Sequence, residues 1–336
     1  MTKRINIGLI GLGRLGRNYA DYFANRIPAA NLIAISDIDR QSMDACANEF
    51  GISKCFSDYI DLVADKEVDA VVIVTSTSTH RDIILAAAKH GKAIFCEKPL
   101  TLSLQEGVEI KQGVDDAGVF FHMGFMRRFD KGYLAAKRQI EDGVIGTPVV
   151  FQSTTRDPHP PPVEYLKVSG GLFIDMGIHD FDLARWFMGE VENIYASGCA
   201  LAYPEIKEIG DIDNGIANLN FENGALGVVN LCRNGIYGYH IRTEIVGTKG
   251  TIKIGYLRET PIVVMTKEGV CHDTVPFFME RFTDAYITQL ENFVENIIRE
   301  KEPAITCNDG VEVLKISLAA KSSYTNKQAV AIRDSN

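Results

Sequence analysis

The first 125 residues alternate short apolar runs with segments of helical spacing. The pattern predicts strands at residues 5–10, 32–36, 68–75, 93–96 and 119–123, and helices at residues 14–27, 40–50, 79–90 and 104–117. The strand at 68–75 is apolar on nearly consecutive positions, which is typical of a strand buried on both faces. Strands of this kind, separated by helices, indicate parallel pairing with right-handed crossovers. The expected architecture is an α/β doubly wound parallel sheet.

The pattern changes after residue 125. Helices are expected at residues 133–141 and 171–188, and the stretch from 191 to 275 is mostly short strands punctuated by Gly and Asn. The short turn Glu222-Asn223-Gly224 favours antiparallel pairing of its neighbours. We therefore expect a second, α+β domain with a mainly antiparallel open sheet. Its strands are predicted at residues 216–221, 225–231, 240–246, 251–254 and 262–266, with closing helices at 282–299 and 310–324.

Composition and charge exclude several classes of protein. The 336 residues carry 35 Lys and Arg against 44 Asp and Glu, a formal charge of −9, which disfavours binding to nucleic acid or anionic lipid. No segment approaches the roughly 20 apolar residues that span a bilayer, and the N-terminus lacks a small-residue cleavage site. The seven cysteines are scattered, with no Cys-x-x-Cys pair. We therefore expect a cytoplasmic chain with reduced thiols, no bound metal, and no membrane or nucleic-acid partner.

A glycine-rich motif follows the first expected strand. Gly11-Leu12-Gly13-Arg14-Leu15-Gly16 matches G-x-G-x-x-G and opens a helix. In a dinucleotide-binding turn the first glycine permits the tight bend, the second lets the backbone approach the pyrophosphate, and the third lets helix and strand pack closely. The first-turn N–H groups of the helix then face the phosphates. An acidic residue, Asp37, stands 21 positions after Gly16 at the end of the next strand, which completes the motif.

Asp37 selects the cofactor. A carboxylate at this position accepts hydrogen bonds from the ribose 2′-hydroxyl and repels a 2′-phosphate. Arg40 is close by in the sequence and partly offsets that repulsion. The expected cofactor is NAD, with NADP less favoured.

Two further segments carry side chains suited to proton transfer. Glu97-Lys98-Pro99 follows an expected parallel strand, at the end where open α/β sheets place their ligands. Asp175 and His179 are four residues apart in the helix expected at 171–188, a spacing that puts both on one face. The carboxylate can orient the imidazole as a general base, and Lys98 can stabilise a developing alkoxide. A solvated lysine and a surface Asp/His pair are the alternative interpretation of these residues.

Together these motifs resemble one family. The glycine motif, residues 75–80 (Thr-Ser-Thr-Ser-Thr-His), Glu97-Lys98-Pro99 and Asp175-x-x-x-His179 occur in this order and at these distances in the glucose–fructose oxidoreductase/inositol dehydrogenase family. The similarity covers essentially the whole chain. Residues 124–130 (Gly-Phe-Met-Arg-Arg-Phe-Asp) resemble the inositol dehydrogenases within it.

The resemblance implies an NAD-binding Rossmann domain at residues 1–124 and a substrate-binding and oligomerisation α+β domain at 125–336, whose C-terminal helices can pack back on the first. It implies Lys98, Asp175 and His179 as catalytic residues, a cis peptide bond between Lys98 and Pro99, and a homotetramer. The residues it implies for cofactor binding are Gly11, Gly13, Arg14, Leu15, Gly16, Asp37, Ile38, Thr75, Ser76, Thr77, His80, Glu97 and Lys98.

The resemblance also implies a polyol pocket. A cyclic polyol presents hydroxyls on all sides, so its pocket needs both donors and acceptors. The segment Thr155-Arg156-Asp157 departs from the His and Asn expected on either side of that Arg in myo-inositol-specific members, which leaves scyllo-inositol, another isomer or a pyranose sugar open. The residues implied for the substrate are Lys98, Arg127, Asp157, Asp175, His179 and Tyr237.

The expected activity is the NAD-dependent oxidation of a ring hydroxyl of inositol, myo or scyllo, to the ketone. A pyranose dehydrogenase or reductase is one alternative within the family. An NAD-dependent glycoside hydrolase that reduces and reoxidises its cofactor in each cycle is another. A non-enzymatic NAD sensor is less consistent with Lys98, Asp175 and His179, because a sensor needs no base.

Overall fold

The structure is a computed structural model that describes residues 4–334. The chain divides into two compact units. The first comprises the chain up to Met126 together with Tyr286–Leu314, and the second comprises Arg127–Ala285 together with the chain from Lys315 on. The sequence-based division instead assigns every residue after 124 to one domain.

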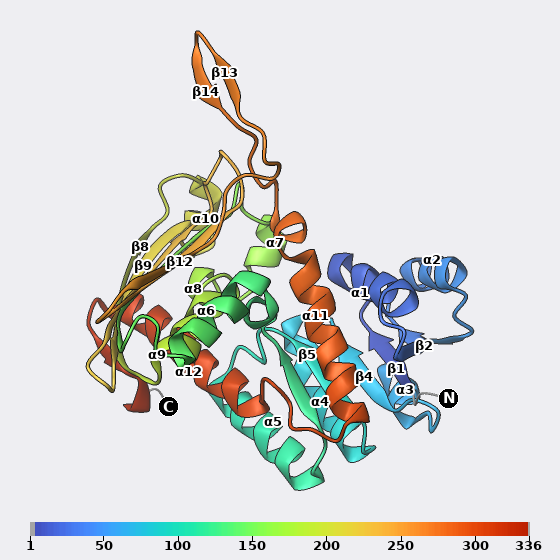
Figure 1. The fold of residues 1–336 in the computed structure, drawn as a ribbon. Helices are drawn as coiled ribbons and strands as arrows, with labels where there is room; N and C mark the ends of the chain where they lie inside the picture. Colours follow the sequence, from blue (N-terminus) through green and yellow to red (C-terminus); the bar gives the residue numbers. More distant parts are fainter. Residues whose placement is uncertain (1–3, 335–336) are drawn as a thin grey trace. The chain divides into compact units, whose positions relative to one another are not determined.

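A six-stranded parallel sheet forms the centre of the first unit (Figure 1). Its strand order, β3-β2-β1-β4-β5-β6, reverses between β1 and β4, which is the doubly wound arrangement predicted from the sequence and typical of Rossmann domains. β4 is buried at all four positions, as expected of a strand covered on both faces. The strands are β1 (Ile5–Ile10), β2 (Ala30–Ser36), β3 (Lys54–Phe56), β4 (Ala70–Ile73), β5 (Ala93–Glu97) and β6 (Phe121–Gly124).

The helices that connect these strands start and stop at local signals. Asp39 accepts hydrogen bonds from the first-turn N–H groups of α2, and Gly51 ends this helix with φ of +68°. The sequence pattern predicts neither β3 nor α3, because three and six residues are too few to display a period. The helices are α1 (Arg14–Asn25), α2 (Arg40–Phe50), α3 (Tyr59–Ala64), α4 (His80–Lys89) and α5 (Leu104–Ala117), with a 3₁₀ turn η1 (Thr77–Thr79).

The second unit is built on a seven-stranded sheet of order β12-β11-β7-β10-β9-β8-β15. Its neighbours pair antiparallel except β7 and β10, which are parallel, so the expectation of a mainly antiparallel sheet is confirmed. The strands are β7 (Pro148–Arg156), β8 (Val191–Cys199), β9 (Asn214–Phe221), β10 (Leu226–Cys232), β11 (His240–Gly247), β12 (Thr251–Ile254) and β15 (Val330–Ala331).

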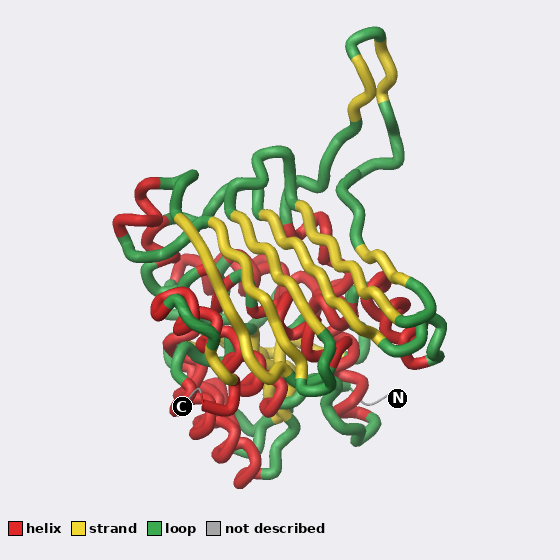
Figure 2. The backbone as a smooth tube through the Cα atoms, turned by 90° about the vertical axis from the view of Figure 1, so that its left-hand side faces the viewer, coloured by secondary structure: helices red, strands yellow, loops and turns green. Residues whose placement is uncertain are grey.

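Helices of the second unit cover one face of this sheet. α9 packs against β7 and β10, whereas no helix crosses the strands on the broad face that Figure 2 turns to the viewer. Side chains of β9 alternate between buried and exposed accordingly. The helices are α6 (Lys131–Glu141), α7 (Val163–Leu166), α8 (Leu172–Asp175), α9 (Ile178–Met188) and α10 (Pro204–Glu208), with 3₁₀ turns η2 (Met126–Phe129) and η3 (Ile332–Asp334).

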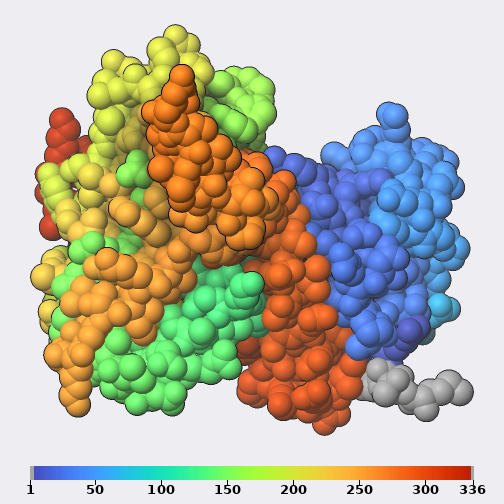
Figure 3. Space-filling model, turned by 45° about the horizontal axis from the view of Figure 1, so that its top comes forward, coloured from blue at the N-terminus to red at the C-terminus, as the bar shows by residue number. Residues whose placement is uncertain are grey.

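Three further features complete the description. A hairpin of β13 (Val264–Thr266) and β14 (Gly269–Cys271) projects as a narrow arm in Figure 1 and is orange in Figure 3. All six of its strand residues are exposed. The long helices α11 (Phe278–Ile298) and α12 (Cys307–Asn326) each pass from one unit to the other along the chain. Among residues 4–334, none of the helices combines the length and apolar character needed to cross a bilayer.

Candidate functional site

The glycine-rich turn joins β1 to α1 where the strand order of the first sheet reverses. Gly11 has φ of +94°, and a Cβ there would lie 2.7 Å from the carbonyl oxygen of Val74. A Cβ on Gly16 would lie 2.0 Å from the carbonyl oxygen of Gly11. Around Gly13, by contrast, no atom lies within 4 Å of the Cβ position. The protein's own packing therefore requires two of the glycines, and the third leaves open space at the start of the helix.

The start of α1 and the end of β2 provide the groups that a dinucleotide needs. No side chain caps the helix at Gly13, so its first N–H groups can face an anion. The Asp37 carboxylate accepts hydrogen bonds from the N–H of Leu12 at 2.6 Å and of Asp39 at 2.8 Å. Each of its oxygens keeps a lone pair for a ligand hydroxyl. Ile38 beside it is 98% exposed, so apolar surface is also present.

His80 links the ends of β4 and β5. Its Nδ1 lies 2.9 Å from the carbonyl oxygen of Pro99, and its Nε2 lies 3.2 Å from that of Thr75. The ring is almost fully buried, and this burial lowers the pKa of the imidazole. The peptide bond between Lys98 and Pro99 is cis, as the resemblance implies. His80 thus holds the loop after β4 against the segment that carries Lys98.

Glu97 and Lys98 end β5 in different environments. Glu97 is 5% exposed, and its carboxylate accepts hydrogen bonds from the Tyr19 hydroxyl and, at 3.1 Å, from the Lys98 N–H. Burial raises the pKa of the Glu97 carboxyl. Gln289 donates to the Tyr19 hydroxyl at 2.8 Å, which extends the buried network. The Glu97 side chain is therefore engaged inside the first unit, whereas Lys98 is only half-buried.

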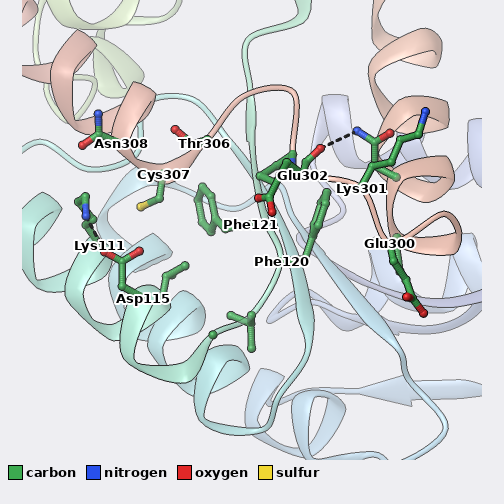
Figure 4. A pocket seen from close by; sticks show the side chains of 16 residues that line it. Lys111, Asp115, Phe120, Phe121, Glu300, Lys301, Glu302, Thr306, Cys307 and Asn308 are labelled. Carbon is green, nitrogen blue, oxygen red and sulfur yellow. Dashed lines mark hydrogen bonds and ion pairs between the residues drawn. The ribbon is translucent and has the colours of Figure 1, made fainter.

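A cavity of about 570 Å³ lies elsewhere in the first unit. Figure 4 shows Lys111 and Asp115, an ion pair of 2.5 Å on α5, beside Cys307 at the start of α12. Burial raises the pKa of the Cys307 thiol to about 12. Of the described residues that line the cavity, none belongs to the glycine turn, and neither Asp37 nor Lys98 is among them. The cavity is therefore separate from the candidate cofactor residues.

Asp175 and His179 lie on two short helices. The prediction of one helix over 171–188 is wrong, because the helix is interrupted between α8 and α9. The N–H of Gly177 bonds five residues back to the carbonyl of Leu172 at 3.0 Å, which widens the last turn of α8. A Cβ on Gly177 would lie 2.8 Å from the carbonyl oxygen of Phe173. The chain is therefore not one regular helix between Asp175 and His179, although Met176 and Gly177 keep right-handed helical dihedrals.

Tyr165 and Arg233 hold the Asp175 carboxylate at the end of α8. The Tyr165 hydroxyl donates to Oδ1 at 2.8 Å, and the Arg233 guanidinium donates from Nη2 to Oδ2 at 3.0 Å. Arg233 is fully buried, and its Nη1 lies 3.9 Å from Asp211 Oδ2. His179, in the first turn of α9, is 8% exposed. The second unit therefore supplies a firmly held carboxylate and a nearly buried imidazole.

Arg127 lies in a buried ion pair. Its Nη1 donates to Asp180 at 3.1 Å, and Thr155 Oγ1 lies 3.2 Å from the same nitrogen. Burial opposes the charged form of Arg127, but the Asp180 carboxylate together with the hydroxyls of Tyr239 and Tyr133 outweighs this and raises the pKa of the guanidinium. The side chain is 1% exposed, and its Nε has no hydrogen-bond partner among the described residues. Substrate binding by Arg127 stays a prediction, and the N–H at Nε is the donor that such binding would use.

Asp157 and Tyr237 lie at one end of the second sheet, where the Gly235 N–H donates to the Asp157 carbonyl at 2.8 Å. The strand register places Arg156 of β7 beside Cys232 of β10 and His240 of β11. The Asp157 N–H donates to the Cys232 carbonyl at 2.9 Å, and the Tyr237 hydroxyl lies 3.1 Å from His240 Nδ1. Both side chains are at least partly exposed. The two predicted substrate residues thus lie on neighbouring loops.

Sequence reasoning does not find Tyr165, Asp211 or Arg233. Tyr165 and Arg233 are 10 and 58 residues from Asp175 in the chain, and no motif connects them. The sequence shows only a glycine at position 171. In the structure its φ is +95°, and a Cβ there would lie 2.9 Å from Asp211 Oδ1. A glycine at this position is consistent with a side chain packed closely against the backbone, but it does not identify Asp211 as that side chain.

Two family models match the chain. Residues 5–125 match the NAD-binding Rossmann fold of an oxidoreductase family, and residues 137–332 match the C-terminal alpha/beta domain of the oxidoreductase family. Together the two matches cover most of the chain.

Relatives match over the full chain as well. The scyllo-inositol 2-dehydrogenase (NAD⁺) of Bacillus subtilis is 40% identical over 333 residues, which are 99% of this chain and 97% of that protein. The myo-inositol 2-dehydrogenase of Thermotoga maritima is 40% identical over 332 residues, 98% of this chain and 99% of that protein. The crystal structure of scyllo-inositol dehydrogenase from Lactobacillus casei with bound NAD(H) and scyllo-inositol has a TM-score of 0.94 at 34% identity, covering 99% of this chain and 100% of that chain. The chain therefore belongs to the glucose–fructose oxidoreductase/inositol dehydrogenase family of oxidoreductases, as its motifs predict.

Proposed function

We propose that this chain is an inositol dehydrogenase that oxidises one ring hydroxyl of inositol, myo or scyllo, to the ketone with NAD⁺. The observation that carries the proposal is the 40% identity, over 99% of the chain, with the NAD⁺-dependent scyllo-inositol 2-dehydrogenase of Bacillus subtilis. The residues described above supply the groups that such a reaction needs.

The first unit fits NAD. The open space at Gly13 and the uncapped start of α1 suit the pyrophosphate. The Asp37 carboxylate suits the ribose hydroxyls, and Ile38 offers apolar surface to the adenine. Glu97 contributes through its backbone, because its carboxylate is engaged elsewhere. Within the proposal the other residues that flank the cofactor are Arg14, Leu15, Thr75, Ser76, Thr77 and His80. When bound, NAD⁺ supplies the nicotinamide carbon that accepts a hydride.

The proposal assigns proton transfer to three side chains. His179 accepts the proton of the ring hydroxyl at an imidazole nitrogen, as a general base. Asp175, held by Tyr165 and Arg233, stabilises the imidazolium that results. The Lys98 ammonium stabilises the negative charge that develops on the oxygen.

Recognition of the polyol falls to groups on the second unit. Asp157 can accept hydrogen bonds from ring hydroxyls, and the Tyr237 hydroxyl can donate or accept. Arg127 contributes the N–H at Nε that lacks a protein partner. Such donors and acceptors favour a ligand that presents hydroxyls on several sides, because an analogue lacking one leaves a buried group unpaired.

Initial rates with NAD⁺ and NADP⁺ against myo-, scyllo- and chiro-inositol, glucose and xylose test the proposal. We expect the highest kcat/KM with NAD⁺ and either myo- or scyllo-inositol. The highest value with glucose or xylose would instead identify a pyranose dehydrogenase. Tight NAD⁺ binding without turnover of any polyol would identify a sensor.

The amount of NADH formed per substrate molecule distinguishes a dehydrogenase from a glycoside hydrolase of the same family. A dehydrogenase forms one NADH for each free polyol oxidised, whereas a hydrolase that recycles its cofactor cleaves a glycoside without net NADH. We expect net NADH. A chromogenic glycoside cleaved with no NADH formed would contradict the proposal.

The proposal extends to a cytoplasmic homotetramer, which the family resemblance implies. The free state of all seven cysteines is consistent with a reducing compartment. Light scattering coupled to gel filtration tests the assembly, and a mass of one or two chains would contradict the tetramer.

A further inference from the structure

Two side chains of the second unit, Tyr165 and Arg233, bind Asp175 directly, and Asp211 contacts Arg233 and the start of α8. Tyr165 comes from α7, Arg233 follows β10, and Asp211 precedes β9. We infer that these three residues, here called the Asp175 clamp, are positioning residues that set the orientation of the Asp175 carboxylate for catalysis. The inference rests on the proposed function, because it acts through the role given there to Asp175.

α8 cannot orient Asp175 by itself. It has four residues, and a single turn is marginal without tertiary contacts, because nucleation fixes several dihedrals for one hydrogen bond. Asp175 is its last residue, and the i to i−4 hydrogen-bond pattern is interrupted just after it, where the Gly177 N–H bonds to the carbonyl of Leu172. The direction of the carboxylate therefore depends on side chains outside the helix.

Arg233 is the strongest member of the clamp. It is fully buried, and its Nη2 donates to Asp175 Oδ2 at 3.0 Å. Its Nε and Nη1 have no hydrogen-bond partner among the described residues. Among the described residues, Asp175 is therefore the side chain to which the guanidinium donates a hydrogen bond. A charge-assisted bond of this kind is strong and directional.

Asp211 holds the other end of α8. Its Oδ1 accepts the N–H of Leu172, the first residue of that helix, at 3.1 Å. Its Oδ2 lies 3.9 Å from Arg233 Nη1. Gly171 permits this approach, because a Cβ there would lie 2.9 Å from Asp211 Oδ1. Both ends of the one-turn helix are therefore fixed by a facing carboxylate and guanidinium.

The charges also favour a role beyond packing. One buried cation lies between two carboxylates whose side chains are 11% and 13% exposed. Removing Arg233 would take away the buried cation that both carboxylates contact, so we expect the Asp175 carboxylate to turn toward water. A displacement of about 1 Å in a positioning group can cost on the order of 100-fold in rate.

A double-mutant cycle tests the inference in the full chain. The variants are Arg233→Met, Asp175→Asn and the pair, each assayed for kcat and KM with NAD⁺ and the best inositol isomer. We expect Arg233→Met to lower kcat by roughly 10- to 100-fold with KM for NAD⁺ changed less than about threefold. We expect the double variant to be no slower than Asp175→Asn, because a residue that acts through Asp175 has nothing to orient once its charge is gone.

Arg281→Met is the matched control. Arg281 forms a buried ion pair of 2.7 Å with Asp130 in the same unit, and its described ring contacts are with Tyr256 and Phe282 and not with the clamp. We expect Arg281→Met, like Arg233→Met, to lower Tm, because each removes a buried charged partner. Any effect of Arg281→Met on kcat should multiply with the effect of Asp175→Asn. This contrast separates a positioning role from general loss of stability.

Tyr165→Phe covers the case in which Arg233→Met does not fold. Tyr165 is 47% exposed, so removing its hydroxyl leaves no cavity. We expect a loss of a few-fold in kcat that disappears in the Asp175→Asn background. Losses that multiply in every double variant that folds, with the unmodified enzyme active, would overturn the clamp alone. Absence of inositol oxidation by the unmodified enzyme would overturn the proposed function and the inference with it.

Discussion

The Asp37 carboxylate and the backbone N–H of Leu12 are joined by a hydrogen bond of 2.6 Å. This bond ties the end of β2 to the glycine turn after β1. The carboxylate proposed to meet the adenosine ribose is therefore positioned by the same turn that is proposed to meet the pyrophosphate. Cofactor selectivity and phosphate binding share one rigid element.

Asp37→Asn should relax the preference for NAD⁺ over NADP⁺. The amide oxygen can still accept the Leu12 N–H, but the negative charge that repels a 2′-phosphate is gone. We expect the ratio of kcat/KM for NAD⁺ to that for NADP⁺ to fall about tenfold or more, measured by initial rates. Asp39→Asn is the control, since Asp39 caps α2 instead of the turn. An unchanged ratio in Asp37→Asn would show that the carboxylate does not select the cofactor.

Gly13→Ala and Gly16→Ala should fail in different ways. The new Cβ of Gly16→Ala would lie 2.0 Å from the Gly11 carbonyl oxygen, so we expect the free protein to lose roughly 1–3 kcal/mol of stability. Gly13 has φ of −63° and open space around it, so Gly13→Ala should cost under about 1 kcal/mol. Its methyl group should instead weaken NAD⁺ binding about tenfold or more.

Thermal unfolding without cofactor and calorimetric titration with NAD⁺ measure the two effects. Each glycine variant serves as the control for the other. Equal losses of Tm, or unweakened NAD⁺ binding by a folded Gly13→Ala protein, would contradict the assignment of the turn.

His179→Ala should remove the general base. We expect kcat to fall by about 10²- to 10⁴-fold, while NAD⁺ binding, which the proposal assigns to the first unit, stays within about twofold. Stopped-flow or steady-state NADH formation gives kcat, and calorimetry gives the affinity for NAD⁺. His240→Ala is a matched control in the same unit, since its ring contacts Tyr237 but is given no part in proton transfer. A His179→Ala enzyme that keeps most of its kcat would refute the mechanism.

His80 should make stability depend on pH. Burial lowers the pKa of its imidazole below the ordinary value of 6.5, so between these two values the unfolded chain binds a proton that the folded chain does not. The contribution of neutral His80 to stability is present above pH 6.5 and is lost as the pH falls through the lower, folded-state value. We expect the drop in Tm between pH 7.5 and pH 5.5, on the order of a few degrees, to be smaller in His80→Gln.

His90→Gln controls for the general effect of losing a histidine. His90 follows the same helix and is exposed, so its variant should keep the pH dependence of the unmodified chain. The same drop in all three proteins would show that the acid sensitivity arises elsewhere.

Features that depend on neighbouring residues could be predicted from the sequence. The doubly wound sheet follows from apolar runs separated by helical spacing, and the cofactor turn follows from glycines whose conformational and packing needs are local. β7, by contrast, is not predicted although it lies inside the second sheet. Its Ser153, Thr154 and Thr155 are buried polar residues, and they hide the apolar alternation by which a strand is recognised.

The sequence by itself determined the family, the fold class, the glycine turn, and the residue types available for catalysis, because each is encoded by short-range pattern or by motif spacing. Only the tertiary structure decided the surroundings of Asp175, which ends one short helix and is held by Tyr165 and by Arg233, 58 residues away. It also decided that Glu97 turns into the core and that Arg127 pairs with Asp180. Charged groups taken out of water must find partners wherever the chain brings them, and local sequence does not specify that choice.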